Sequence, residues 1–340
     1  MPTQALGTRG LSSRHIWIVL GATLVVGVLI ASGGTPTHVA NTLRDNVQSF
    51  GVSFEQSAAA KQLQSDNRQQ FDNVCGPLYA GQPYHIHRWS RGNYSTQNFG
   101  DEIGPDLVER ILGGQRVLRG PEHPRLLTIG SYAHFAARCT ILWGTGSRSH
   151  PYPPPTEIVQ VRATRGPLTR KAIMQRYPNL YVPEIYGDPA LLVPKFFPEI
   201  ERPDDVPDDL MGRVVVLLHM GDLGSNDDVV EKLPSDWRIV SALAADWRDV
   251  VREIRNSTFV ISSSMHGLIL ADAYGVPSRG VMLRHFEPEF KFHDYYEGTG
   301  RPNYRRANSI SEAVFLGPED PLQWDYRPLL DAFPRELFAN

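Results

Sequence analysis

This chain has polar residues, and one glycine, close to the ends of its apolar segments. Together they could bind an anion and move a proton. In chain order they are Asp101, His134, Gly144, Arg165, Ser262, Ser263, Ser264, His266 and Arg284. Hydroxyls and backbone N–H groups at a strand-to-helix turn can bind an anion, and a guanidinium can bind a carboxylate or a phosphate through two hydrogen bonds. Imidazole gains and loses a proton near neutral pH. These residue types predict a site for an anionic ligand with acid–base chemistry.

Each of these residues also has a purely structural interpretation. The serines at 262–264 could only cap the helix that follows them, and His134 could be an ordinary residue at a helix start. Arg165 could form a structural ion pair, and Asp101 could only orient the loop before its helix. Their recurrence at the ends of successive segments favours a functional site.

The segments that must position these residues alternate between strand and helix patterns from about residue 82. Apolar strands are predicted at 125–131, 140–146, 157–166, 213–220, 238–244, 258–264 and 279–284. Helices are predicted at 106–114, 167–177, 246–257 and 267–275. Such alternation predicts parallel sheets covered on both faces. The Pro- and Asp-rich stretch 198–209 divides them into two Rossmann-like domains, 78–202 and 203–340, which are expected to face a central cleft at the carboxyl ends of the strands.

The amino-terminal segment indicates a membrane anchor. Residues 16–32, IWIVLGATLVVGVLIAS, carry no charge and would span roughly 25 Å as a helix. Basic residues precede them, which places 1–15 in the cytoplasm and the rest of the chain outside it. Residues 33–77, rich in Ser, Gln and Ala, are predicted to form a stem. A cleaved signal peptide is the alternative, and it too places the domains in a secretory lumen or outside the cell.

The composition limits the class of function. The chain has 340 residues and a formal net charge of −3, so a bulk nucleic-acid binder is not indicated, and an anionic ligand needs a local cluster of positive groups. Two cysteines, Cys75 and Cys139, could form one disulfide bridge or remain buried thiols. The histidines show neither H-E-x-x-H nor Cys/His ligand spacing, so no metal is expected.

Two distinctive sequence motifs lie near the carboxyl terminus: SSSMHGLILADAYGVP (262–277) and EFKFHDYYEGTG (289–300). Five more lie upstream of them. These are GDPALLVP (187–194), TRGPLTRKAI (164–173), LWGTG (142–146), IGSYAHFA (129–136) and NFGDEIGPDLVERILG (98–113). The ordered set resembles the polysaccharide pyruvyl transferase family, and the likeness runs from about residue 97 to 300.

The resemblance implies a GT-B-like fold, with two Rossmann-like domains, and a specific reaction. Members transfer the enolpyruvyl group of phosphoenolpyruvate onto two hydroxyls of one sugar, which forms a pyruvate ketal and releases phosphate, with no cofactor. Membrane-anchored members are similar to Golgi enzymes that act on galactose of cell-surface glycans. This implies a single-pass type II membrane protein with lumenal domains and a glycan or polysaccharide acceptor that presents galactose or a similar hexose. The carboxyl-terminal tail is expected to cross back to the first domain.

The resemblance also assigns residues by position. His134 and Arg165 match residues of the donor pocket, and His266 matches the histidine of an S-x-L-H-G turn. Some members have an arginine where this chain has Ser264, and Arg284 or Lys291 could supply the missing positive charge.

Roles in proton transfer are left open among His134, His266, Asp101 and Asp294. His134 and His266 are the candidates for general acid and general base. The Asp101 carboxylate could accept a hydroxyl proton.

Two other functions fit parts of the sequence. A GT-B glycosyltransferase that uses a nucleotide sugar would share the fold, the anchor and a phosphate site at a helix terminus. An inactive, anchored, lectin-like protein would share the fold and the anchor but not the chemistry. Binding of phosphoenolpyruvate or of a nucleotide sugar would separate these hypotheses.

Overall fold

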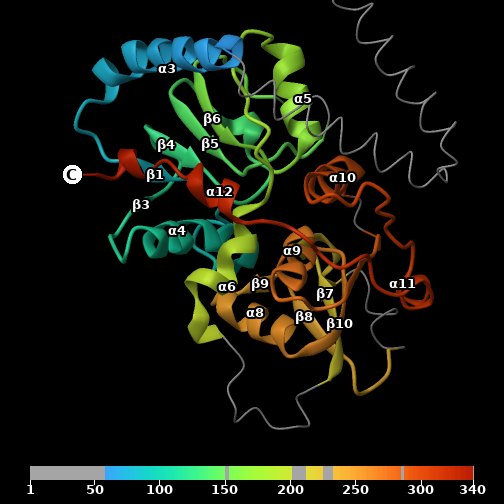
Figure 1. Cartoon of the computed structure of the whole chain (residues 1–340). Coiled ribbons are helices and arrows are strands. Elements are labelled where there is room, and N and C mark those ends of the chain that lie inside the picture. The colour runs from blue at the N-terminus through green and yellow to red at the C-terminus, as the bar shows by residue number, and fades with distance from the viewer. Residues whose placement is uncertain (1–57, 150–152, 201–211, 225–232, 285–286, 340) are drawn as a thin grey trace, which may run out of the picture. The chain divides into compact units, whose positions relative to one another are not determined.

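The computed structural model describes residues 58–149, 153–200, 212–224, 233–284 and 287–339. The chain divides into two compact units, Met1–Lys61 and Gln62–Asn340, and the second holds both sheets (Figure 1). The second unit begins within the segment expected to form a stem. The expected membrane segment, 16–32, lies outside the described residues. Within the described ranges, no helix is long and apolar enough to cross a membrane.

The first sheet holds five parallel strands in the order β3-β1-β4-β5-β6. The strands are β1 (His85–Ile86), β3 (Leu118–Arg119), β4 (Arg125–Leu127), β5 (Thr140–Trp143) and β6 (Val159–Ala163). Every residue of β4 and β5 is buried, as expected for inner strands of a parallel sheet.

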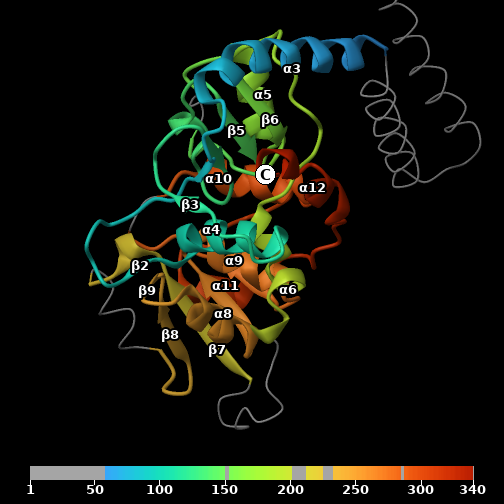
Figure 2. The same ribbon diagram turned by 90° about the vertical axis from the view of Figure 1, so that its left-hand side faces the viewer.

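The second sheet holds four parallel strands in the order β11-β10-β7-β8. The strands are β7 (Arg213–Leu218), β8 (Arg238–Ser241), β10 (Ser257–Ser262) and β11 (Ser278–Gly280). Its helices are α8 (Trp247–Arg255), α9 (Met265–Ala273), α10 (Glu289–Gly298) and α11 (Ile310–Leu316). Figure 2 shows α8 and α9 beside this sheet. The predicted alternation of strands and helices around parallel sheets is therefore confirmed.

The helix after β2 (Gln97–Asn98) begins earlier than the sequence predicted. α4 (Phe99–Ile111) starts seven residues before the expected helix at 106 because Asn98 caps it. The Asn98 side chain accepts a hydrogen bond of 3.2 Å from the Gly100 N–H, which satisfies one of the free donors of a helix start. The earlier start places Asp101 in the first turn of α4.

Segments far apart in the sequence join the two sheets. β2 (Gln97–Asn98) pairs in antiparallel fashion with β9 (Leu243–Ala244). The carboxyl-terminal segment reaches the first sheet at α12 (Arg327–Asp331), where Trp143 Nε1 donates to the Leu329 carbonyl at 2.8 Å. Arg335 donates to the Ile111 carbonyl at the end of α4, also at 2.8 Å. The expected return of the tail to the first sheet is observed.

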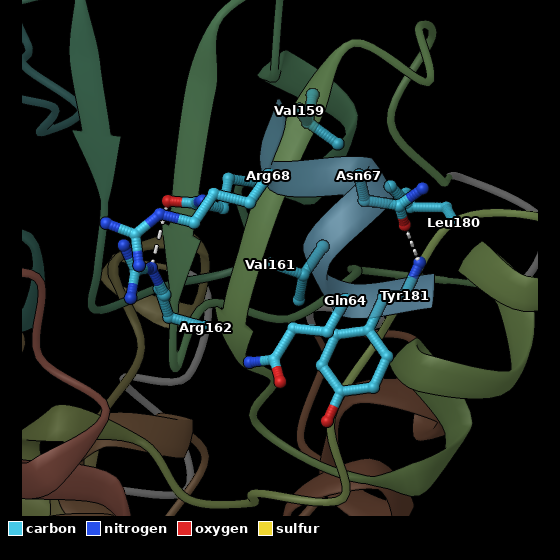
Figure 3. A pocket seen from close by; sticks show the side chains of 9 residues that line it. Gln64, Asn67, Arg68, Val159, Val161, Arg162, Leu180 and Tyr181 are labelled. Atoms are coloured by element: carbon cyan, nitrogen blue, oxygen red, sulfur yellow. Dashed lines mark hydrogen bonds between the residues drawn. The ribbon is translucent and has the colours of Figure 1, made fainter. Parts of the chain in front are cut away.

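Helix α3 (Ala58–Tyr79) is held by a disulfide bridge between Cys75 and Cys139. Of the two states that the sequence left open, the structure shows the bridge. Asn67 adds a hydrogen bond of 3.0 Å to the Asn179 carbonyl and accepts one from the Tyr181 N–H, drawn as a dashed line in Figure 3. The cavity between α3 and β6 measures about 50 Å³, which is too small for a sugar.

Candidate active site

A cleft of about 300 Å³ lies where strands of both sheets end. Ser131 follows β4, His219 follows β7 and Ser264 follows β10, and all three residues line the cleft. Asp101 enters it from the first turn of α4. The cleft therefore occupies the position where parallel α/β sheets bind their ligands.

Only part of the predicted residue set lines this cleft. The residues that do are Asp101, His134, Ser264, His266 and Lys291. Gly144, Arg165, Ser262 and Ser263 are buried, and Arg284 is exposed outside its wall.

His266 lies in the first turn of α9, against the start of α4. A Cβ atom added to Gly100 would come within 1.9 Å of its Nδ1, so only glycine allows α4 to approach this closely. Burial, with Lys291 and Arg165 nearby, lowers the pKa of His266 to about 3. The imidazole is therefore neutral near pH 7. Its Nε2 is buried and has no hydrogen-bond partner among the described residues.

A buried carboxyl group lies beside His266. Asp188 Oδ2 is 4.0 Å from His266 Nε2, and Asp188 Oδ1 accepts a hydrogen bond of 3.0 Å from the Ala190 N–H, where it caps a 3-10 helix at Pro189–Leu192. Burial raises the pKa of Asp188 to about 6, although the Ala190 hydrogen bond and Arg165 oppose the rise. A buried carboxyl group with a raised pKa therefore lies close to the His266 imidazole, beyond hydrogen-bond distance.

The three serines before α9 make different contacts. The Ser262 hydroxyl donates to the Ser264 carbonyl at 2.9 Å and accepts from the Ser264 N–H at 3.0 Å, which fixes the turn. The Ser263 hydroxyl accepts a hydrogen bond of 2.9 Å from the His219 N–H. Ser264 is the N-cap residue of α9 but makes no side-chain cap hydrogen bond, and it lines the cleft.

Asp101 is a buried carboxyl group whose pKa lies close to neutral pH. Burial raises its pKa to about 7, and a hydrogen bond donated by the Tyr132 hydroxyl opposes that rise. The same hydroxyl accepts a hydrogen bond of 3.2 Å from the Trp89 N–H. A carboxyl group whose pKa is close to the working pH is well suited to general base catalysis.

A charged cluster forms another part of the wall. Lys291, from α10, donates to Glu287, and Arg148 donates to the same carboxylate at 2.9 Å. His219 Nε2 lies 3.9 Å from Glu287. Burial lowers the pKa of Lys291, and Glu287 opposes this shift. Two cations that share one carboxylate leave a net positive charge for an anionic ligand.

Arg165 acts through its neighbours rather than at the cleft wall. Its guanidinium is fully buried and lies 3.3 Å from Asp294 Oδ2, and it donates to the Ser131 hydroxyl at 2.8 Å. Asp294 also accepts two hydrogen bonds from Thr169, at 2.8 Å and 2.6 Å, which ties α10 to α5 (Pro167–Arg176). Arg165 therefore orients Ser131 from behind the cleft.

Three further predicted positions have clear local roles. His134 lies in a 3-10 turn (Ala133–Phe135) on the cleft wall, and burial, with Arg148 nearby, lowers its pKa. Gly144 has a positive φ of 77° and lies so close to Pro189 that an added Cβ atom would come within 2.4 Å of it. Of the two candidates for the missing charge, Lys291 lines the cleft and Arg284 does not.

The sequence reasoning missed several residues of the site. Tyr132, Arg148, Asp188 and Glu287 were not predicted, although Asp188 lies in GDPALLVP and Tyr132 in IGSYAHFA. The contact of Tyr132 with Asp101 and that of Arg148 with Glu287 join positions far apart in the sequence, whereas the spacing of Glu287 and Lys291, four residues apart, was a signal that could have been used. Within the described part of the chain, no group of three or more His, Cys, Asp or Glu residues could hold a metal ion.

Fold and site together define an α/β protein with a cleft whose wall includes Arg148 and Lys291, and comparisons with known proteins identify its family. A family model described as "Polysaccharide pyruvyl transferase" matches residues 113–283, half of the chain. The chain belongs to the polysaccharide pyruvyl transferase family. The resemblance found in the sequence is thereby confirmed.

Two individual proteins are similar over different extents. The succinoglycan biosynthesis protein ExoV of Rhizobium meliloti (strain 1021) is 37% identical over 73 residues, which cover 21% of this chain and 23% of ExoV. The chain thus matches about a quarter of the length of that relative. The crystal structure of an uncharacterized protein from Klebsiella pneumoniae subsp. pneumoniae NTUH-K2044 shows a TM-score of 0.37 and 12% identity, covering 72% of this chain and 98% of that one.

Proposed function

We propose that this protein transfers the enolpyruvyl group of phosphoenolpyruvate onto two hydroxyls of a terminal galactose or similar hexose of a glycan. The observation that carries the proposal is one cleft that combines cations, a helix amino terminus and a carboxyl group of raised pKa. Family membership supports the reaction type, and the net charge of −3 makes a local cationic pocket necessary for such a donor.

The donor is proposed to lie between Lys291, Arg148 and the start of α9. Phosphoenolpyruvate carries a phosphate and a carboxylate, so it needs more than one positive group. Lys291 and Arg148 supply two, and the N–H groups at the amino terminus of α9 favour a further negative charge. His266, in the first turn of that helix, then lies beside the bound phosphate.

The reaction requires proton transfers that this site can perform. The methylene carbon of phosphoenolpyruvate gains a proton, which leaves an oxocarbenium-like carbon at C2. One sugar hydroxyl bonds to C2, the bond between C2 and the phosphate oxygen breaks, and a second hydroxyl closes the ketal. The two hydroxyls release two protons, of which one balances the proton added to the methylene and the other leaves with phosphate. We assign Asp101 as the base for the hydroxyls and His266 to the departing phosphate.

Donor binding is expected to take up protons. The pKa of His266 is about 3 and that of Asp101 about 7 in the free protein. A bound anion favours the protonated form of both groups, so each pKa rises and protons enter from solvent at pH 7. Calorimetric titration of the full chain with phosphoenolpyruvate, in two buffers of different ionisation enthalpy, measures this uptake. A binding heat that is equal in both buffers would contradict the assignment.

The same titration tests the cationic wall. We expect Lys291→Met to weaken phosphoenolpyruvate binding at least about tenfold, because one charge-assisted contact is lost. Arg284→Ala is the matched control, since Arg284 is a cation outside the cleft wall. Equal loss in the two variants would place the donor elsewhere.

The location of the protein is part of the proposal. We propose a GT-B-like pair of domains in the Golgi lumen, on a type II anchor formed by residues 16–32. The charge-free composition of that segment supports the anchor. The Cys75–Cys139 bridge supports an oxidising compartment, because disulfides persist there and are rare in the cytosol.

A further inference from the structure

Aromatic side chains gather on one wall of the cleft. Trp89, Tyr132, His134 and Phe135 all line it. Phe135 is 45% exposed, and Trp89 is partly exposed. A large apolar ring left open to solvent inside a polar cleft is the kind of exposed apolar surface that marks a binding site.

Neighbouring side chains hold the aromatic residues of this wall in place. The ring of Phe135 lies 4.0 Å from that of His134 and 6.2 Å from that of Tyr132, measured between centroids. His87 packs edge-on against Tyr132 at 4.8 Å, and burial lowers the pKa of His87 to about 4, so it is a neutral neighbour near pH 7. Arg125 donates to the Phe135 carbonyl. Because these neighbours hold the Phe135 ring in place, the ring loses little conformational freedom when a ligand covers it.

The same wall leads to the proposed base. The Tyr132 hydroxyl donates to Asp101 and accepts the Trp89 N–H. One hydrogen-bonded chain thus joins the backbone of Trp89, the aromatic wall and the carboxyl group of Asp101. A sugar ring stacked on Trp89 or Phe135 would lie in the same cleft as that carboxyl group.

The distribution of charge in the cleft indicates which substrate would bind to the aromatic wall. The cations of the cleft, Arg148 and Lys291, gather around Glu287, and an anionic donor belongs with them. Aromatic faces instead suit an uncharged ligand with an apolar face and polar edges. The C–H face of a pyranose ring, with hydroxyls around its rim, has this character.

We propose that Trp89 and Phe135 form the acceptor platform, on which the hexose ring of the glycan stacks with its hydroxyls directed to Asp101. The proposal rests on the proposed function for the identity of the second substrate, but it concerns glycan binding, which can be measured without phosphoenolpyruvate.

The test is saturation-transfer NMR on the full chain with N-acetyllactosamine, a galactose-terminated disaccharide, in the absence of donor. We expect saturation of the galactose protons with the unaltered protein and at least a tenfold weaker affinity with Phe135→Ala and with Trp89→Ala. Phe135→Tyr keeps the ring and is expected to retain binding. Phe315→Ala is the control, because Phe315 is 88% exposed on α11 and lies outside the cleft wall. Thermal unfolding verifies that each variant is folded.

The outcomes separate this proposal from the donor assignment. Loss of disaccharide binding in the Phe135 and Trp89 variants supports the platform even if phosphoenolpyruvate is not the donor. Equal binding by Phe135→Ala and Phe315→Ala overturns the platform, even if phosphoenolpyruvate is turned over. The unaltered protein failing to bind the disaccharide also overturns it. In active protein, the platform further predicts a raised KM for the glycan and an unchanged KM for phosphoenolpyruvate.

Discussion

Asp101→Asn is expected to lower kcat by roughly 10²- to 10⁴-fold, the usual contribution of a general base. The amide keeps the size of the carboxyl group and can still accept the hydrogen bond from Tyr132, but it cannot take a proton from a sugar hydroxyl. The fold should survive, because burial already disfavours the charged carboxylate and raises its pKa to about 7. Initial rates of phosphate release, together with thermal unfolding, measure both effects.

The pH dependence of kcat/KM is a second test of Asp101 as the general base. As base, Asp101 must be ionised, so kcat/KM should rise with increasing pH through about 7. The Tyr132 hydrogen bond lowers the pKa of Asp101, so Tyr132→Phe should shift that rise to higher pH. A profile that is unchanged in Tyr132→Phe, or an Asp101→Asn variant with normal kcat, would remove Asp101 from the reaction.

Loss of the Cys75–Cys139 bridge is expected to cause the largest change in stability. The two cysteines are 64 residues apart, and opening a loop of that size lowers the free energy of unfolding by about 4 kcal/mol in the chain-entropy account. For a unit of this size the midpoint should fall by roughly 10 °C. Thermal unfolding of the full chain with and without reductant measures the change.

A double variant, Cys75→Ser with Cys139→Ser, is the control for reductant. It should unfold at the lower midpoint and show no response to reductant. A midpoint equal to that of the bridged protein would mean that packing of Phe71 in the core and the Asn67 hydrogen bonds hold α3 without the bridge.

The sequence predicted the frame of the site because that frame depends on local patterns. The apolar run TILW buries a whole strand and RVVVLL buries the last four residues of another. The carboxyl-end rule for parallel sheets then brings Ser264 and His266 to one cleft with Asp101. The start of α4 was missed because Asn98 caps the helix before Asp101. Side-chain capping of this kind moves a helix boundary without changing the apolar pattern.

The electrostatics of the site could not be predicted from spacing. The Arg165 guanidinium is buried against Asp294, which lies on α10. Because this contact joins segments far apart in the sequence, the place of Arg165 behind the cleft wall could not be recognised from the sequence. Lys291 gains its place through Glu287 and Arg148, and His266 is neutral because of burial and nearby cations. Each of these properties arises only when distant segments pack together.

Transfer of an enolpyruvyl group to a sugar can be tested by observing the product itself. The full chain is incubated with phosphoenolpyruvate and N-acetyllactosamine, and the sugar is examined by NMR for a new methyl signal of a pyruvate ketal. We expect this signal, with one phosphate released for each ketal formed, and its loss in Asp101→Asn. A glycan extended by a sugar when nucleotide sugars replace phosphoenolpyruvate, with no ketal formed from phosphoenolpyruvate, would contradict it.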